Sequence, residues 1–350
     1  MQGSWYTISM NIKENVQLSP FTTFHVGGSA RYFAEVKSVD DLIVVTHEAG
    51  KKQRDMFILG GGSNILISDE GFDGYVIQMN IGGVDINRLD DGNYEVIVGA
   101  GENWDALVEF CVNKGLWGLE NLSYIPGSVG GAVVGNIGAY GAEMADTVHW
   151  VEVFDRKHGV TRKLMKNECG FGYRESIFKS EEGEDLIVTK VCMLLSEKGK
   201  PNTTYKEIET IFKKAGIEKP TLDQMRKLIC ALRKKKLPDW KQFGSAGSFF
   251  TNPIVSRLKF IFLKWKYPGL QGNKVEGGIK ISAAWLIDHV CDLKGLKINN
   301  VSLYTHQPLI IVTENEARAK DVMRLSQLVI REVYDKTKIK LEPEVIFVGF

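Results

Sequence analysis

The stretch Ile125–Gly141 reads IPGSVGGAVVGNIGAYG, and it decides how the surrounding chain is interpreted. Glycine is dense in it, and it carries no charged residue. We expect no regular helix or strand here, because glycine weakens both. The polar backbone of such a segment needs hydrogen-bond partners inside the fold. A flat group with donors and acceptors along its edge, such as a flavin ring, is one such partner, and an unusual structural loop is the alternative.

A second glycine-rich loop, LGGGSN at Leu59–Asn64, lies between two apolar runs of strand type. Successive glycines can turn backbone N–H groups toward an anion, and Ser63 and Asn64 add side-chain donors. The loop matches neither a Walker A motif nor a dinucleotide fingerprint, because no Lys-Ser/Thr pair follows it and the next segment is a strand. Pyrophosphate binding and a simple tight turn are both open interpretations of this loop alone.

The segments around these loops alternate between strand and helix patterns. The frequency of β-branched and aromatic residues predicts strands over residues 31–36, 55–68 (interrupted by LGGGSN), 74–80, 94–101, 148–155, 159–166 and 185–196. Apolar periodicity predicts helices over residues 38–52, 103–115 and 220–237. Ser38 with Asp41, and Thr221 with Gln224, have the spacing of capping boxes at two of the helix starts. This mixture predicts an α+β protein with more than one domain.

Residues 241–337 are predicted to form a third domain, with helices over 283–290 and 317–336 and a strand over 308–313. A last strand is predicted over 340–350. Within the third domain, SRLKFIFLKWKYPG mixes lysines with aromatic and aliphatic residues and ends at Pro268 and Gly269. The pattern is typical of a packed helix or of a helix that lies on a membrane surface. We expect the packed helix.

The composition limits the class of protein. The 350 residues carry a formal net charge of +1, which argues against a general nucleic-acid binder. Five cysteines without a CxxC pair predict buried thiols in a reducing compartment, and we expect no metal. The first residues lack a signal-peptide pattern, and no apolar run reaches the ~20 residues of a membrane span. We therefore expect a cytoplasmic protein that binds neither membranes nor nucleic acids.

Three polar residues stand in unusual surroundings. Arg174 follows the apolar approach CGFGY, where a fixed guanidinium can grip a carboxylate, although a surface arginine paired with Glu175 or Glu168 is the alternative. Glu344 lies in the predicted final strand, where burial would raise its pKa and suit it to proton donation, unless it faces outward. Ser248 lies in GSAGSFF and can donate a proton only if a carbanion or enolate forms beside it.

These motifs occur together in one known family. The chain carries, in the order seen in UDP-N-acetylmuramate dehydrogenase (UDP-N-acetylenolpyruvoylglucosamine reductase), the segments PFTTFHVGG, LGGGSN, GLENLSYIPGSVGGAVVGNIGAYG, FGYRESIFK, KKKLPD, GSAGSFFTNP, AAWLID and LEPEV. The resemblance covers roughly residues 18–349, and the spacer PNTTYKEIE resembles the type I subgroup. The chain departs from the family pattern in three places: Ile346 stands where Arg is frequent, WLIDHVCDLKG is one residue longer than usual, and GGAVVGN is similar to type II.

The resemblance implies a two-part FAD-binding fold of the PCMH/vanillyl-alcohol-oxidase type plus a smaller α+β substrate-binding domain. The implied parts are an N-terminal extension (1–17), two FAD-binding subdomains (18–83 and 84–238), a substrate-binding domain (239–338) and a final strand (339–350) that returns to the second subdomain. It also implies non-covalent FAD, NADPH as co-substrate, and reduction of UDP-N-acetylglucosamine enolpyruvate to UDP-N-acetylmuramate for peptidoglycan precursors. We expect a monomer.

The resemblance also implies roles for single residues. Hydride from flavin N5 reaches C3 of the enolpyruvyl group, Arg174 and Glu344 act on the charge that develops, and Ser248 protonates C2. The implied FAD contacts are Gly60, Gly61, Gly62, Ser63, Asn64, Ile125, Pro126, Gly127, Ser128, Gly131, Asn136 and Gly138. The implied substrate contacts are Tyr205, Lys236, Asn252 and Lys280.

Two rival functions fit parts of the same pattern. A flavin oxidase of the same superfamily would often attach FAD covalently, and His25 is a candidate for that bond. A non-catalytic nucleotide-sugar binding protein would not need Arg174, Ser248 and Glu344 together.

Overall fold

The computed structural model describes residues 10–239 and 242–350, and within them the chain folds into two compact units. Unit 1 comprises the described residues up to Val16 together with Ala30–Gly61 and Asp73–Lys235. Unit 2 comprises Gln17–Ser29, Gly62–Phe72 and Lys236–Phe350. Residues 12–17 of the expected N-terminal extension form a strand, and residues 1–9 of it lie outside the described residues. The other domain boundaries stay predictions.

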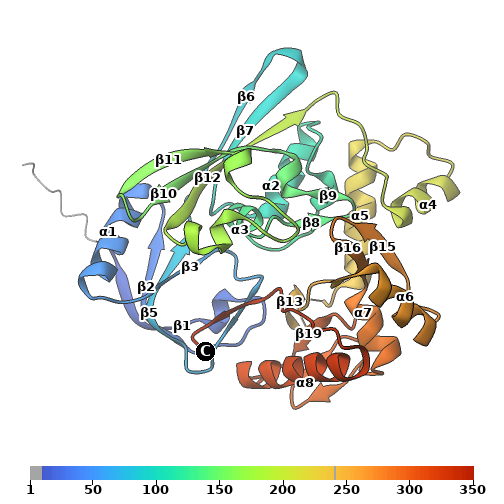
Figure 1. The fold of residues 1–350 in the computed structure, drawn as a ribbon. Coiled ribbons are helices and arrows are strands. Elements are labelled where there is room, and N and C mark those ends of the chain that lie inside the picture. The colour runs from blue at the N-terminus through green and yellow to red at the C-terminus, as the bar shows by residue number, and fades with distance from the viewer. Residues whose placement is uncertain (1–9, 240–241) are drawn as a thin grey trace, which may run out of the picture. The chain divides into compact units, whose positions relative to one another are not determined.

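The first sheet of unit 1 has the strand order β1-β2-β5-β3 (Figure 1). These strands span Ile12–Gln17, Ser29–Val36, Phe72–Met79 and Met56–Leu59. Helix α1, Val39–Lys51, follows β2, and β3 pairs in parallel with β5. The predicted capping box is confirmed, because the Asp41 N–H donates to Ser38 Oγ at 3.1 Å and the Asp41 carboxylate accepts from the Ser38 N–H at 3.0 Å.

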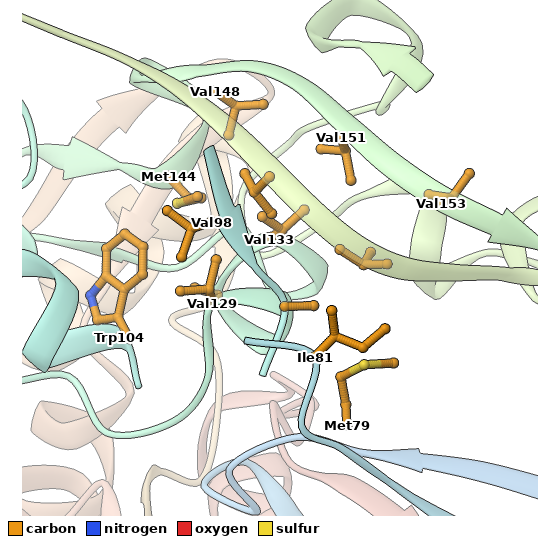
Figure 2. Close-up of a cluster of buried hydrophobic side chains, with 14 of the residues drawn as sticks. Met79, Ile81, Val98, Trp104, Val129, Val133, Met144, Val148, Val151 and Val153 are labelled. Carbon is orange, nitrogen blue, oxygen red and sulfur yellow. The ribbon is translucent and has the colours of Figure 1, made fainter. Parts of the chain in front are cut away.

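The second sheet of unit 1 is antiparallel, with the order β11-β10-β12-β7-β6. Its strands span Val160–Met165, Val148–Asp155, Leu186–Ser196, Asn93–Gly99 and Val84–Arg88. Helix α2, Trp104–Asn113, follows β7. Figure 2 shows Trp104, Val98, Val133 and Met144 in one buried cluster beneath this sheet. The predicted strands are confirmed, and β6 is a strand that the sequence pattern did not reveal.

The expectation of no regular structure in Ile125–Gly141 is wrong for its middle part. Helix α3 spans Val129–Val134, and Ser128 Oγ caps it by accepting from the Gly131 N–H at 3.2 Å. Gly130 lies so near the end of β7 that an added Cβ would be 3.0 Å from Ala100 Cβ. Close packing on the core, which only glycine allows here, therefore outweighs the low helix propensity of glycine. The remainder of the stretch holds only the two-residue strands β8, Gly138–Ala139, and β9, Ala142–Glu143.

Two helices complete unit 1. Helix α4 spans Lys206–Lys214 and α5 spans Leu222–Lys236, where it reaches the first residue of unit 2. The predicted capping box of α5 is confirmed: Gln224 N–H donates to Thr221 Oγ1 at 3.2 Å, and Thr221 N–H donates to Gln224 Oε1 at 2.8 Å.

Unit 2 contains three small sheets around its own core. The sheet β13-β19-β18-β17 is antiparallel and its strands span Gly244–Ser248, Ile310–Thr313, Val301–Leu303 and Lys297–Ile298. The sheet β14-β16-β15 spans Ile254–Val255, Gly278–Ile281 and Gly272–Val275. Strand β20, Ile346–Val348, pairs in parallel with β4, Ile65–Ile67. The final strand is shorter than predicted, and Glu344 precedes it because its N–H bonds to the Phe249 carbonyl instead.

The helices of unit 2 include α6, Arg257–Lys266, and the long α8, Ala319–Thr337. Helix α7, Ala283–Trp285, continues as a π-helix over Leu286–Val290. This π-helix lies in WLIDHVCDLKG, the segment expected to hold one residue more than the family spacing, and a π-bulge can accommodate an additional residue in a helix.

Helix α6 exists where it is expected, but the expectation that it is packed is wrong for one of its faces. Only Leu263 is buried, whereas Leu258 is 81% exposed and Trp265 is 79% exposed. The sequence spacing could not separate the two cases, because a buried apolar stripe and an exposed one have the same period. Of the helices in residues 10–239 and 242–350, none is long and apolar enough to cross a membrane.

Candidate active site

The predicted site residues fall in both units. Unit 1 holds Gly60, Gly61, Ile125, Pro126, Gly127, Ser128, Gly131, Asn136, Gly138, Arg174 and Tyr205. Unit 2 holds Gly62, Ser63, Asn64, Lys236, Ser248, Asn252, Lys280 and Glu344.

In unit 1 the two glycine loops lie against each other. A Cβ added to Gly61 would come within 2.6 Å of Gly127 Cα, and one added to Gly60 would come within 2.5 Å of Ser128 Oγ. Side chains at these positions would push the loops apart, so glycine is required for the close approach. The structure thus brings four of the predicted FAD contacts together.

Buried acceptors accompany this pair of loops. The Gln78 amide donates to the Gly60 carbonyl at 2.9 Å, while its Oε1 is buried and has no hydrogen-bond partner among the described residues. Asn121 resembles it: its amide donates to the Tyr140 and Asn202 carbonyls, both at 2.9 Å, and its Oδ1 is buried without a described partner. Buried acceptors of this kind are costly unless a donor reaches them. A flavin nucleotide carries ring N–H and hydroxyl donors, so these residues and the glycine cradle fit FAD.

The side chain of Asn136 stabilises the glycine loop by hydrogen bonds. Its amide donates to Glu143 Oε2 at 3.1 Å and to the Gly172 carbonyl at 2.8 Å, and its Oδ1 accepts from the Ala145 N–H at 3.0 Å. Both amide protons are therefore engaged within the protein. The structure places Asn136 as a link between the loop and the segment before Arg174.

Left-handed backbone conformations gather around this loop. Tyr124, Asn136, Tyr140 and Arg174 have φ values of 60°, 37°, 49° and 58°. Such conformations cost energy in residues other than glycine, and they concentrate at functional sites. Arg174 is held beside this loop by a hydrogen bond from its Nη2 to the Gly138 carbonyl at 2.8 Å, and its catalytic role stays a prediction.

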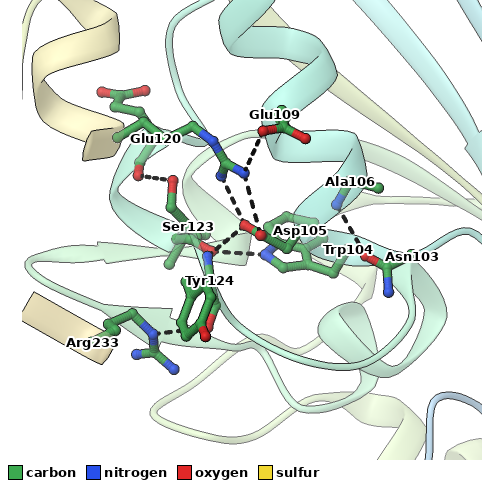
Figure 3. Close-up of polar contacts among 11 residues, drawn as sticks. Asn103, Trp104, Asp105, Ala106, Glu109, Glu120, Ser123, Tyr124 and Arg233 are labelled. Carbon is green, nitrogen blue, oxygen red and sulfur yellow. Dashed lines mark hydrogen bonds and ion pairs between the residues drawn. The ribbon is translucent and has the colours of Figure 1, made fainter. Parts of the chain in front are cut away.

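Arg233 is a residue of this region that the sequence pattern missed. Its Nε donates to the Tyr124 carbonyl at 3.0 Å (Figure 3). Burial lowers the pKa of the Arg233 guanidinium, and the charge of Arg174 acts in the same direction. Two cations held near one another attract an anionic group, for which a substrate carboxylate or diphosphate is suitable. Arg233 precedes the run Lys234–Lys236, and no local pattern distinguishes it from these lysines.

The surroundings of Tyr124 are rigid. Asp105 accepts a hydrogen bond from the Tyr124 N–H and pairs with Arg226 at 2.8 Å. Trp104 is fully buried and donates from Nε1 to the Leu122 carbonyl at 2.9 Å (Figure 3). These contacts fix the segment that leads into the glycine loop.

Tyr205 stands at the start of α4 and remains 44% exposed. Its ring meets that of Tyr140 edge to face, with 5.2 Å between the centroids. The predicted substrate contact therefore lies next to a strained residue of the glycine loop.

In unit 2, three segments far apart in sequence meet at Glu344. The Asn64 amide donates to the Glu344 carbonyl at 3.1 Å, and the Glu344 N–H donates to the Phe249 carbonyl at 2.9 Å. Phe249 directly follows Ser248, which is exposed at the end of β13, and Gly247 before it has φ of 69°. The structure thus brings Asn64, Ser248 and Glu344 to one place.

The contacts around Ser248 show what a serine between a glycine and two phenylalanines does in the fold. Phe249 and Phe250 are buried in the core of unit 2, with their ring centroids 5.0 Å apart. They anchor the end of β13, while the left-handed Gly247 and the register shift between Ser245 and Ser248 interrupt the pairing just before Ser248, which lies opposite Ile310 as the last residue of the strand. The exposed Ser248 hydroxyl is therefore attached to a backbone that the two buried phenylalanines hold in place.

Asn252 and Lys280 lie together in unit 2. Asn252 Oδ1 accepts from the Ala283 N–H at 3.0 Å, and Lys280 is opposite Ile254 in the sheet β14-β16. The Ile281 N–H donates to the Pro253 carbonyl at 3.0 Å and ties the two segments. Lys236 is half-buried at the end of α5.

Two surface hollows of the described chain lie elsewhere. Volumes of about 380 Å³ and 690 Å³ are lined by residues from Met10–Asp41 and Ala145–Leu194, and no predicted site residue is among them. No three His, Cys, Asp or Glu side chains of residues 10–239 and 242–350 are grouped so that they could hold a metal. The candidate site is therefore defined by its glycine contacts, strained residues and cations.

Comparison with known proteins identifies the family. Residues 30–164 match the FAD binding domain, and residues 239–348 match the UDP-N-acetylenolpyruvoylglucosamine reductase C-terminal domain. The chain is 37% identical over 343 residues to the UDP-N-acetylenolpyruvoylglucosamine reductase of Photobacterium profundum, covering 97% of this chain and 96% of that one. It belongs to the UDP-N-acetylenolpyruvoylglucosamine reductase family.

Further relatives agree with this assignment. The reductase of Amoebophilus asiaticus is 36% identical over 337 residues, covering 96% of this chain and 99% of that one. The crystal structure of the reductase from Thermus caldophilus has a TM-score of 0.66 at 30% identity, covering 97% of this chain and all of that one. As a member of this reductase family with an FAD-binding domain, the protein is an FAD-dependent oxidoreductase with the predicted α+β fold.

Proposed function

We propose that the protein reduces the enolpyruvyl ether of UDP-N-acetylglucosamine to UDP-N-acetylmuramate, with non-covalent FAD and with NADPH as the reductant. The observation that carries the proposal is the match to reductases of this name along 97% of the chain. The meeting of Asn64, Ser248 and Glu344 in unit 2 supports it further.

When bound, FAD supplies hydride transfer, taking a hydride from NADPH and giving one to C3 of the enolpyruvyl group. We propose that Gly60–Asn64 and the segment Ile125–Gly138 hold it. The close contact of Gly61 with Gly127 leaves backbone rather than side chains to face the cofactor. The buried Gln78 and Asn121 acceptors supply partners for its donors.

The new C–H bond at C3 leaves an electron pair at C2, which spreads into the substrate carboxylate. We propose that Arg174 stabilises this charge, since its guanidinium is fixed by the Gly138 carbonyl before substrate arrives. Arg233 adds a second cation in unit 1. A preorganised cation lowers the barrier more than one that must be recruited.

Protonation at C2 completes the reaction, and we propose Ser248 as the donor. Its O–H bond breaks as the C–H bond at C2 forms, and solvent returns a proton to the exposed serine oxygen. We propose that the carboxyl group of Glu344, whose backbone is tied to the residue after Ser248, acts beside it as a hydrogen-bond donor to the same charge. Tyr205, Lys236, Asn252 and Lys280 are the proposed contacts to the nucleotide sugar.

The visible absorbance of the purified protein tests the proposal. A flavin spectrum should bleach with anaerobic NADPH and return when UDP-N-acetylglucosamine enolpyruvate is added. Flavin that leaves the protein on denaturation would support non-covalent binding. A protein that neither carries nor takes up FAD would overturn the proposal. We also propose a cytoplasmic monomer, which size-exclusion chromatography tests for the oligomeric state.

A further inference from the structure

The apolar face of α6 has an ordered arrangement. Leu258, Ile261, Phe262 and Trp265 are exposed by 81%, 53%, 55% and 79%. With 3.6 residues per turn they form one continuous stripe. The rings of Phe262 and Trp265 lie beside each other, with centroids 6.3 Å apart. A contiguous group of large apolar side chains in water marks an interaction surface, whereas single exposed ones do not.

The opposite face holds the helix on unit 2. Leu263 is fully buried in the core of this unit, and Phe260 packs against it. At the C-terminal end, Lys266 Nζ donates to the Lys336 carbonyl at 3.3 Å and Tyr267 Oη donates to the same carbonyl at 3.4 Å. The exposed stripe is therefore carried by an anchored helix.

Basic residues border the stripe on both sides. Arg257 and Lys264 lie two turns apart on one flank, and Lys259 and Lys266 lie two turns apart on the other. The helix contains no acidic residue. A stripe of Leu, Phe and Trp between rows of cations is the pattern of a helix that lies in the interface of an anionic bilayer.

Against the expectation from composition that the protein binds no membrane, we propose that α6 docks it on an anionic lipid bilayer surface. Leu258, Ile261, Phe262 and Trp265 lie in the interface, and Arg257, Lys259 and Lys264 lie at the lipid phosphates. The positive charge of α6 argues against a symmetric contact between the α6 helices of two copies. Such a contact would bring two sets of four cations together without a counter-charge. The same cations are favourable beside anionic lipids. Trp265, which is the most exposed aromatic side chain of the stripe, suits the interface because its ring is amphipathic.

Co-sedimentation of the full chain with vesicles tests this proposal. Vesicles of phosphatidylglycerol and phosphatidylcholine should retain the protein at low salt, and vesicles of phosphatidylcholine alone should retain much less. The double variant Leu258→Ser/Trp265→Ser should weaken partitioning by at least about tenfold. Replacing Arg257, Lys259 and Lys264 with Gln should weaken it by about fivefold for each cation removed, and it should abolish the dependence on phosphatidylglycerol.

A matched control removes exposed apolar side chains elsewhere. Ile43 and Val160 are 43% and 50% exposed in unit 1, and Ile43→Ser/Val160→Ser should partition like the natural chain. All variants should keep their flavin absorbance and reductase turnover, because no α6 side chain belongs to the proposed active site. Absence of wild-type partitioning, or equal partitioning of Leu258→Ser/Trp265→Ser, would overturn the proposal. So would self-association of the natural chain that this variant abolishes, since the stripe would then be an interface between copies.

Discussion

The side-chain amide of Asn64 donates a hydrogen bond to the backbone carbonyl of Glu344 at 3.1 Å, although 280 positions separate them. The return bond also exists, because the Ile346 N–H donates to the Asn64 carbonyl at 3.0 Å. Asn64 and the end of the chain are thereby fixed together within unit 2. Glu344 cannot shift without disturbing Asn64, which couples a proposed FAD contact to a proposed catalytic residue.

The first prediction concerns Ser248. Ser248→Ala should slow the reoxidation of reduced flavin by the enolpyruvyl substrate by about 10²–10⁴-fold, because the C2 proton then has no positioned donor. Reduction of the flavin by NADPH should be unchanged. Stopped-flow absorbance measures both half-reactions separately. Ser245→Ala on the same strand is the control, and an equal loss in both half-reactions would show that Ser248 is not the donor.

The role of Glu344 can be distinguished from that of its neighbour Glu342 by matched substitutions. Glu344→Gln should lower kcat by at least about tenfold, because it removes the carboxyl group proposed to donate toward a negative charge that exists only in the transition state. FAD content should stay the same. Glu342 is exposed and pairs with Lys340 at 3.8 Å, so Glu342→Gln should leave kcat unaltered. Unchanged turnover in Glu344→Gln would reduce the residue to a structural role.

Arg233→Met should weaken substrate binding without a large loss of stability. We expect the KM for the enolpyruvyl substrate to rise by about tenfold, because a cation that faces the anionic ligand is lost. The free energy of unfolding should fall little or rise, since burial disfavours the charge of Arg233 and Arg174 repels it. Steady-state kinetics and urea denaturation measure the two effects. A lower unfolding free energy with an unaltered KM would mean that Arg233 is purely structural.

Glu120 should make stability depend on pH. The residue is 4% exposed, and burial raises the pKa of its carboxyl although Oε2 accepts from the Gly118 N–H at 2.8 Å. A raised pKa in the folded state contributes stability below the ordinary carboxyl range and loses it as the pH rises through the folded value. Glu120→Gln, which keeps an acceptor for Gly118, should therefore gain stability relative to the natural chain between pH 5 and pH 8. Urea denaturation at both pH values measures this, and a constant difference would contradict it.

The thiols should be nearly inert in the native protein. Burial raises the pKa of Cys111 and Cys192 to about 12 and that of Cys169 to about 11. Cys230, which is partly exposed, is the one that a thiol reagent should reach first at pH 8. Cys230→Ser should remove the rapid phase of the reaction with Ellman's reagent, and unfolding in guanidinium should release all the others. Several rapid thiols in Cys230→Ser would contradict the buried positions.

The sequence predicted those features that depend on residues close to one another in the chain. The capping boxes at Ser38 and Thr221 predict where two helices begin, and both capping hydrogen bonds are present in the structure. Glycine was harder to interpret, because α3 depends on the contact of Gly130 with Ala100, which no local pattern records. Arg233 was missed for the same reason, since its carbonyl partner on Tyr124 lies 109 positions away.

The π-helix at Leu286–Val290 has a consequence for the comparison of relatives. We expect this widened turn to hold the additional residue, so that the strands that follow keep their register within unit 2. An alignment with relatives should then show a gap at this position, while the backbones before and after it superpose without a shift. Length variation in this family can therefore be absorbed inside a helix, at a place where a reader of sequences would look for a longer loop.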